Sequence, residues 1–231
     1  MEQLRNFGDE RNQGFCVHCG GPDESNDHIP SKVLLDEPFP HNMHVCACCL
    51  RCNKGLSADE EYVACLLECV LAGSTEPTNI QRTKIGRLLA AKPPLIARLQ
   101  DARSTATSPS EWSVENERVR RVVLKLARGH VAYELNEPQL KDPEDLDFRP
   151  LTTLTDMDRD RFEASYGSLT APWPEVGSRS LQRSLVPGSD AYEPGWIEVQ
   201  DGNYRYHVSQ DGGPTVKIVL REYLACQIHW S

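Results

Sequence analysis

The chain has 231 residues and a formal net charge of −9, and its length suits one large or two small domains with a buried core. The negative charge excludes a general electrostatic attraction to nucleic acid. No segment approaches the roughly 18 apolar residues of a membrane span, and the polar start of the chain lacks the apolar core of a secretory signal. We therefore expect a cytoplasmic protein without a membrane partner.

Two cysteine pairs stand out in the first quarter of the chain. Cys16 and Cys19 form one C-x-x-C turn, and Cys49 and Cys52 form a second about thirty residues later. Zinc favours four soft ligands in a tetrahedron, and two such turns supply them in pairs. The odd number of cysteines, nine, and the missing secretory signal favour thiolates over disulfides. We predict one structural zinc ion.

The second cysteine pair has an alternative. Cys46 and Cys49 have the same C-x-x-C spacing, and nearby histidines can also bind zinc, namely His18, His41 and His44. We take Cys49 with Cys52, because this choice places Asn53 directly after the last ligand. The remaining cysteines are expected to be small core residues, namely Cys65, Cys69 and Cys226.

The first helix is predicted to begin after the cysteine pairs. Residues 1–14 have the polar composition of a loose leader. Ser57 with Glu60 three residues later has the spacing of a capping box, which predicts that the helix begins at Ser57. An apolar stripe follows, and Gly73 supplies a stop signal.

Two more helical regions carry most of the positive charge. One covers residues 80–104 with a break near Pro93, and the other covers 114–128 and ends at Gly129. Between residues 80 and 130 the chain has eleven lysines or arginines and four acids. This basic segment is interpreted either as a solvated helical face or as a phosphate-contacting surface.

The remainder of the chain changes in character. Residues 135–190 are rich in loop-forming residues, and within them only 155–165 has a helical pattern. The runs 196–200, 204–208 and 216–230 are rich in β-branched and aromatic residues and are separated by turn signals at Asp201-Gly202 and Asp211-Gly212-Gly213. They predict an antiparallel β meander at the end of the chain.

The segment between the cysteine pairs resembles the HNH endonuclease family. The resemblance rests on Asp27-His28-Ile29-Pro30-Ser31-Lys32, on Pro40-His41-Asn42-Met43 and on the Cys49–Asn53 segment, and it continues into residues 57–62. It covers about fifty residues well. It implies an α+β fold in which a zinc-stabilised ββα-metal module is followed by helices and the β meander.

The resemblance also implies a domain organisation and a set of catalytic roles. Residues 1–75 would form the nuclease module, 76–134 a helical region with a basic face, and 135–231 a loop-rich and β-rich part of unknown role. In such sites the first histidine is the general base, and the neighbouring acid and the last residue of the motif hold the catalytic metal. These roles are carried here by His28 as the base, Asp27 and Asn53 as metal ligands, and Asn42 as the residue that orients the catalytic loop.

The residue types suit this chemistry. Hydrolysis of a phosphodiester needs an activated water, and His28 has the intrinsic pKa of a general base near neutral pH. Mg²⁺ and Mn²⁺ prefer oxygen ligands, which Asp27 and Asn53 supply. Many members of the family have histidine where this chain has Asn53. Lys32, Arg51 and Lys54 are candidate phosphate contacts.

Three functions follow from these observations. The first is a metal-dependent hydrolase that acts as a DNA endonuclease, with RNA as an open alternative substrate. The second is a non-catalytic zinc module that binds nucleic acid or protein and needs only the four cysteines. The third is a nuclease subunit that a protein partner activates, for example in defence against foreign DNA. A homo-oligomer is the alternative assembly.

Overall fold

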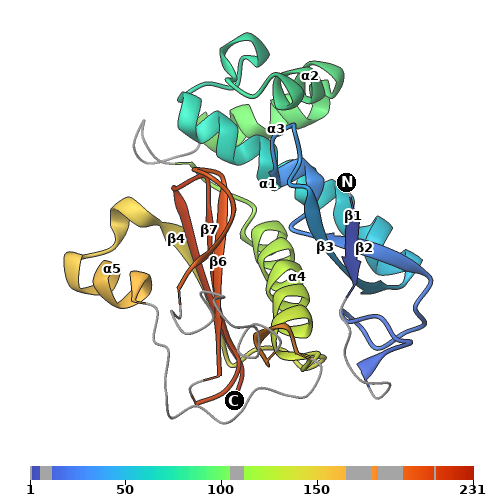
Figure 1. Ribbon diagram of the computed structural model, residues 1–231. Coiled ribbons are helices and arrows are strands. Elements are labelled where there is room, and N and C mark those ends of the chain that lie inside the picture. Colours follow the sequence, from blue (N-terminus) through green and yellow to red (C-terminus); the bar gives the residue numbers. More distant parts are fainter. Residues whose placement is uncertain (1, 6–11, 105–111, 165–177, 182–194, 211) are drawn as a thin grey trace. The chain divides into compact units, whose positions relative to one another are not determined.

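The computed structural model in Figure 1 describes residues 2–5, 12–104, 112–164, 178–181, 195–210 and 212–231. Helices and two separate sheets confirm the predicted mixed α+β class. Contacts divide the chain into two compact units, of which the first combines Met1–Gly55 with Val123–Ser231 and the second is Leu56–Val122. Within the described residues, every helix is too short or too polar to cross a membrane.

A three-stranded sheet carries the start of the first unit. It consists of β1 (Glu2–Arg5), β2 (Ser25–Ile29) and β3 (Asn42–Cys48) in the order β1-β3-β2. β2 is antiparallel to β3, and β1 is parallel to it. The prediction of a loose leader over 1–14 is therefore wrong for residues 2–5, while 6–11 lie outside the described residues.

The helix α1 (Leu50–Ala72) begins seven residues before the predicted start, so the capping box at Ser57 is wrong. The reason lies in the second cysteine pair. The Cys49 sulfur accepts a hydrogen bond from the Cys52 backbone N–H at 3.3 Å, which satisfies one of the free donors at the start of a helix. The predicted end is confirmed, since Gly73 follows Ala72 with a φ of 57°.

The second unit is helical. It contains most of α1, the 3₁₀ helix η3 (Pro77–Asn79), α2 (Thr83–Ala91), α3 (Pro93–Ser104) and the start of α4 (Asn116–Leu135). The prediction of a helical region broken at the prolines is confirmed. α3 begins at Pro93, where proline is tolerated because the first helical N–H has no partner within the helix.

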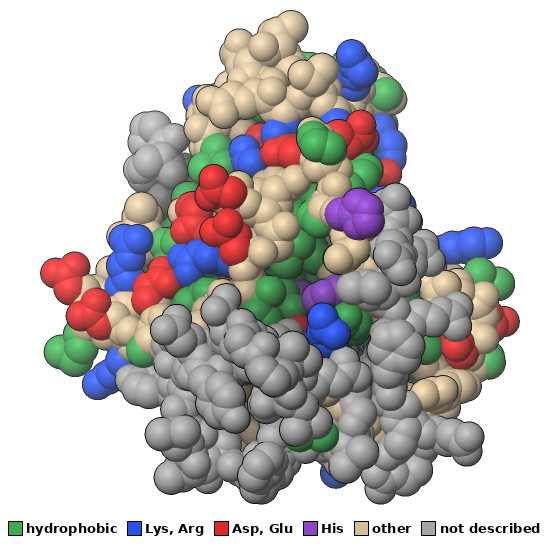
Figure 2. Space-filling view, viewed as in Figure 1, with side chains coloured by type: hydrophobic (Ala, Val, Ile, Leu, Met, Phe, Trp, Pro, Cys, Tyr) green, Lys and Arg blue, Asp and Glu red, His purple; other side chains and the backbone are tan. Residues whose placement is uncertain are grey.

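Several bases of the basic segment are paired with acids inside the second unit. Arg118 and Arg121 both contact the Asp59 carboxylate, at 3.4 and 2.8 Å. Arg82 pairs with the buried Glu68 at 3.7 Å, and further pairs join Lys92 to Glu61 and Arg98 to Glu115. On the coloured part of the face in Figure 2, Lys and Arg side chains lie among Asp and Glu side chains. The excess of bases in the sequence therefore overstates the positive charge of this unit.

The helix α4 continues past Gly129, where the sequence predicted its end. A side chain at position 129 would clash with the Cδ1 methyl of Ile29 in β2. The glycine thus permits close approach of a helix to a strand and does not stop the helix.

The C-terminal sheet confirms the predicted antiparallel meander. β5 (Ile197–Gln200), β6 (Tyr204–Ser209), β7 (Thr215–Leu220) and β8 (Leu224–His229) pair in sequence order. A fifth strand, β4 (Asp145–Pro150), was not predicted and pairs with β8.

The loop-rich stretch before the meander contains more regular structure than predicted. The 3₁₀ helix η4 (Leu151–Thr153) follows β4, and the predicted helix is confirmed as α5 (Asp156–Glu163). Thr155 caps α5, because its hydroxyl oxygen accepts the Asp158 backbone N–H at 3.2 Å. The parts of the predicted loop-rich stretch at 165–177 and 182–194 lie outside the described residues.

The run 216–230, predicted as one β-rich stretch, is two strands joined by a tight turn. Arg221 and Glu222 have φ values of 56° and 45°, the left-handed conformation of a hairpin turn. Glycine or asparagine usually marks such turns. The turn lacks both, which explains why the sequence did not reveal it.

Polar contacts join the sheet to the other parts of the first unit. Figure 1 shows α4 beside the sheet, and His130 of this helix hydrogen-bonds the Tyr204 hydroxyl at 2.7 Å. The Tyr206 hydroxyl donates to Glu134 at 2.6 Å. Asp36, in the loop after the 3₁₀ helix η2 (Lys32–Leu34), accepts from Asn203 at 3.0 Å.

The buried His207 in β6 predicts a loss of stability in acid. Burial, and then the charge of Lys217, lower the pKa of His207 from 6.5 to about 4. The unfolded chain binds this proton more readily, so the stability present above pH 6.5 is lost as the pH falls toward 4. We expect the His207 contribution to unfolding free energy to decline by about 3 kcal/mol over this range.

Urea unfolding of the wild type and of His207→Gln at pH 7 and pH 4.5 measures this effect. The variant should lose less stability between the two pH values than the wild type. An equal loss in both proteins would refute the assignment to His207.

Candidate functional site

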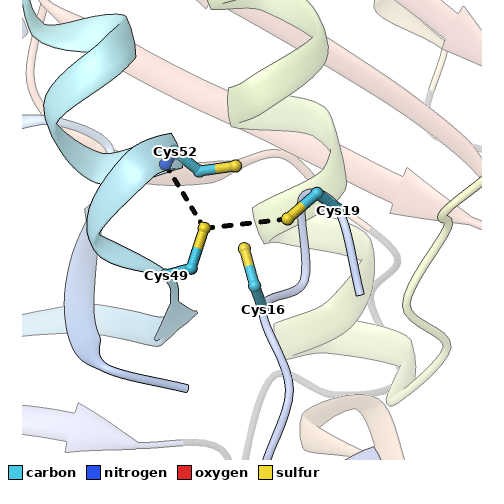
Figure 3. Close-up of side chains that lie close together, drawn as sticks. All are labelled: Cys16, Cys19, Cys49 and Cys52. Atoms are coloured by element: carbon cyan, nitrogen blue, oxygen red, sulfur yellow. Dashed lines mark hydrogen bonds between the residues drawn. The ribbon is translucent and has the colours of Figure 1, made fainter. Parts of the chain in front are cut away.

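Four cysteines from two separate segments come together in the first unit. The sulfur atoms of Cys16, Cys19, Cys49 and Cys52 lie within 4.8 Å of one another, and they converge on a common centre in Figure 3. Cys19 and Cys49 are 3.7 Å apart. Tetrahedral zinc with Zn–S bonds of about 2.3 Å needs sulfur atoms roughly 3.8 Å apart. The four cysteines can therefore hold a zinc ion, and the choice of Cys52 over Cys46 is supported.

The backbone shapes the first cysteine turn. Gly20 N–H donates to the Cys16 carbonyl at 2.8 Å, and Cys16 N–H donates to the Gly21 carbonyl at 2.7 Å. Gly20 has a φ of 72°, which favours glycine. Val17 N–H donates to the Ala47 carbonyl of β3 at 3.0 Å, so the turn is attached to the strand that leads into the second cysteine pair.

The pKa values of the cysteines in the cluster are shifted in different directions. A backbone hydrogen bond from Gly21 lowers the pKa of the Cys19 thiol to about 7, and Arg51 also contacts this sulfur. Burial raises the pKa of Cys16 and of Cys52. A zinc ion would lower all of these pKa values, because it binds the thiolate form.

Asp27 lies in a buried network on one side of β2. Its Oδ2 atom is 3.0 Å from His18 Nε2, and its Oδ1 atom accepts a hydrogen bond from Lys125 Nζ at 2.9 Å. Burial tends to raise the pKa of Asp27, but the His18 hydrogen bond and the Lys125 charge outweigh it and hold this pKa below its usual value. The carboxylate is therefore ionised and paired on both oxygens.

His28 follows Asp27 on the same strand. Neighbouring residues of a strand point to opposite faces, so the imidazole lies on the face away from the Asp27 network. It is half-buried. Burial lowers the pKa of His28, and the charge of Lys32 lowers it further. The ring is therefore neutral near pH 7, which is the form that accepts a proton.

Asn53 lies in the first turn of α1 and contacts β2. Its amide nitrogen donates to the Ser25 hydroxyl at 3.1 Å and to the Asn26 carbonyl at 3.2 Å. The Asn53 amide oxygen consequently points away from these two acceptors. These bonds fix the start of α1 against the strand that carries His28.

The other predicted site residues lie around this strand. Asn42 begins β3 and its side chain is exposed, where its oxygen contacts His41 Nδ1 at 2.8 Å. Lys32 lies 5.9 Å from the centre of the Phe39 ring, and Arg51 and Lys54 are exposed on the first turns of α1. Asn53 is thus hydrogen-bonded to β2, whereas the Asp27 carboxylate points toward His18 and Lys125.

The sequence did not single out Lys125 as a partner of Asp27. Lys125 belongs to the basic segment of the sequence, yet it is 4 % exposed and pairs with a residue 98 positions away. His18 had been noted only as an alternative zinc ligand. A lysine on the apolar side of an amphipathic helix was the available signal, because buried lysines need a partner.

Comparison of the chain with protein-family models, curated proteins and solved structures finds no match. The resemblance to the HNH family therefore stays a prediction that rests on the motif residues of the sequence.

Proposed function

We propose that the protein is a metal-dependent endonuclease of the HNH type that hydrolyses phosphodiester bonds in DNA. One arrangement carries the proposal. The antiparallel pair β2–β3 leads directly into α1, and Asn53 in the first turn of α1 is hydrogen-bonded to the strand that carries His28. This order supports the proposal because it is the one expected of a ββα-metal module. Cys49 and Cys52 lie at the junction of β3 and α1, and Cys16 and Cys19 complete the cluster from the turn before β2.

His28 suits the role of general base. Its lowered pKa keeps the imidazole neutral at physiological pH, so one ring nitrogen can accept a proton from water that attacks the phosphorus. The residue as a whole is partly exposed. The Asp27 network behind the strand limits movement of this segment, which supports a fixed position of the base.

Asn53 offers the type of ligand that a hard cation needs. The amide oxygen is a suitable donor for Mg²⁺ or Mn²⁺. When bound, such a cation would polarise the phosphate and stabilise the departing oxygen. In the proposed site, Asn53 would help to hold the cation, whereas Asp27 would have to share a carboxylate that already binds His18 and Lys125.

The acidic protein would hold its substrate through local contacts. Lys32, Arg51 and Lys54 flank the proposed site in sequence and are the candidate phosphate contacts. Because most charges of the basic segment are paired, we propose that a protein partner or a second copy helps to deliver nucleic acid, as in a defence complex.

The non-catalytic zinc module is the second candidate. One observation favours it, namely that the Asp27 carboxylate is committed on both oxygens to a buried network. In this function His28 would be a partly exposed strand residue, and the four cysteines would suffice.

Cleavage of supercoiled plasmid DNA in Mg²⁺ or Mn²⁺ distinguishes the two functions. The wild type should convert the plasmid to nicked or linear forms, and a chelator should abolish the reaction. Asn53→Ala should slow cleavage by about 100-fold, because a lost ligand weakens the stabilisation of charge by the cation. Asn53→His should restore part of the rate, since imidazole is also a metal ligand.

The variants must be matched for folding and zinc content before the rates are compared. A wild type that leaves plasmid and single-stranded DNA or RNA intact under all these conditions would refute the nuclease and favour the non-catalytic module. Equal cleavage by the wild type and Asn53→Ala would indicate a contaminating nuclease or a site elsewhere.

A further inference from the structure

The segment 27–31 of the first unit has two different sides. Asp27, Ile29 and Ser31 are buried, with 5, 2 and 6 % of their surface exposed. His28 lies between them and is half-buried. Within β2, the alternation of a strand places Asp27 and Ile29 on one face and His28 on the other, while Pro30 and Ser31 lie beyond the end of the strand and are both buried.

The helix α4 binds the buried side of this segment at several points. Lys125 Nζ donates to Asp27 Oδ1 at 2.9 Å and to Ser31 Oγ at 3.1 Å. Gly129, one turn further along α4, lies against Ile29. One face of α4 therefore contacts Asp27, Ile29 and Ser31, which lie on both sides of His28 in the sequence.

Lys125 and Asp27 form an ion pair that is shielded from water. Their side chains are 3 and 6 % exposed, and His18 occupies the second carboxylate oxygen. The ligand atoms of His18, Asp27 and Cys48 lie within 4.8 Å of one another, which is a metal-type cluster. The Lys125 ammonium already supplies the positive charge that a metal would bring there, so these groups are best explained without an ion.

We propose that Lys125 is a positioning residue for His28, acting through the segment 27–31. This proposal rests on the proposed function, because it assigns a support to the residue that would act as the base. Both ends of the segment are bonded to one ammonium, so His28 keeps a fixed direction on the opposite face. The nuclease module would then include α4 and not end near residue 75.

Replacement of Lys125 by methionine tests the proposal. Methionine has a similar length but lacks the charge and both hydrogen bonds. We expect kcat for DNA cleavage to decrease by about 10- to 100-fold, because small displacements of a catalytic group are costly. KM should change less than about threefold, since Lys125 is buried and does not reach the substrate. Arg121→Met, one turn earlier on α4 and half-exposed, removes the same charge and should leave kcat within about twofold.

A second variant tests the proposal even if Lys125→Met does not fold. Removal of Lys125 alone leaves the Asp27 charge buried without its cation, whereas Asp27→Asn with Lys125→Met removes both charges. The double variant should unfold at a higher urea concentration than either single variant and should still show the reduced kcat. Additive losses of stability in the two single variants would refute the coupling of Lys125 to Asp27.

A spectroscopic readout separates this proposal from the nuclease itself. The ¹H–¹³C signal of the His28 ring, assigned with His28→Gln, should broaden or split in the double variant, and the His229 signal should remain unchanged. A wild type without nuclease activity but with this response would refute the proposed function alone. An active enzyme whose kcat and His28 signal are unchanged by Lys125→Met would refute the positioning role alone.

Discussion

Replacement of His28 by alanine should slow phosphodiester cleavage by about 100- to 10,000-fold, the range for removal of a general base. Alanine retains the strand but cannot accept the proton of the attacking water. The folding cost should be small, because His28 lies on the half-exposed face of β2 and outside the Asp27 network. The loss should therefore appear in the rate and not in stability or zinc content.

The measurement is single-turnover cleavage of a labelled DNA duplex at saturating Mg²⁺ or Mn²⁺. His229→Ala serves as the control, because His229 contacts Thr215 in the C-terminal sheet. Its rate should match that of the wild type. Cleavage by His28→Ala at the wild-type rate would exclude His28 as the base, and metal-dependent activity would then require another residue.

Replacement of Cys49 by serine should have the largest effect on stability. Cys49 contributes a sulfur to the cluster of four and also accepts the Cys52 N–H at the start of α1. Structural zinc in small domains contributes about 10–16 kcal/mol of binding free energy, most of which depends on a complete ligand set. We expect zinc content to fall from about one ion per chain to almost none, and the melting temperature to fall by at least about 10 °C.

Cys46→Ser provides the matched control, because Cys46 has the competing C-x-x-C spacing but lies next to His18, with its sulfur 4.0 Å from the imidazole. This variant should keep its zinc. Elemental analysis together with thermal unfolding by circular dichroism gives both readouts. A protein purified without zinc, or zinc loss in Cys46→Ser but not in Cys49→Ser, would contradict the assignment of the cluster.

The predictions that held depend on local patterns. The two C-x-x-C turns specify their own ligand geometry, and the cluster of four cysteines follows from it. The break at Pro93 and the stop at Gly73 reflect the backbone restrictions of single residues. The alternation of large apolar residues with turn signals was sufficient for most of the C-terminal meander.

The predictions that failed concern one helix start that is set by a local cysteine contact and two features that are decided by distant contacts. α1 begins at Leu50 because the second cysteine pair organises its first turn, and a capping pattern at Ser57 cannot reveal that. Gly129 continues α4 because Ile29, a hundred residues earlier, needs the space. The pairing of Asp27 with Lys125 spans a similar separation, and no local spacing encodes it.

Asp27 and Lys125 are 98 positions apart, so they are synthesised at different times. Residues 12–55 contain all four cysteines and leave the ribosome before Lys125 and Gln200, so zinc can bind before those later residues have been synthesised. The Asp27 carboxylate obtains its cation only when Lys125 has been synthesised, and Asp36 obtains its partners Gln200 and Asn203 later still. A nascent or truncated chain would therefore carry the four-cysteine cluster without the contacts that hold the strand of His28.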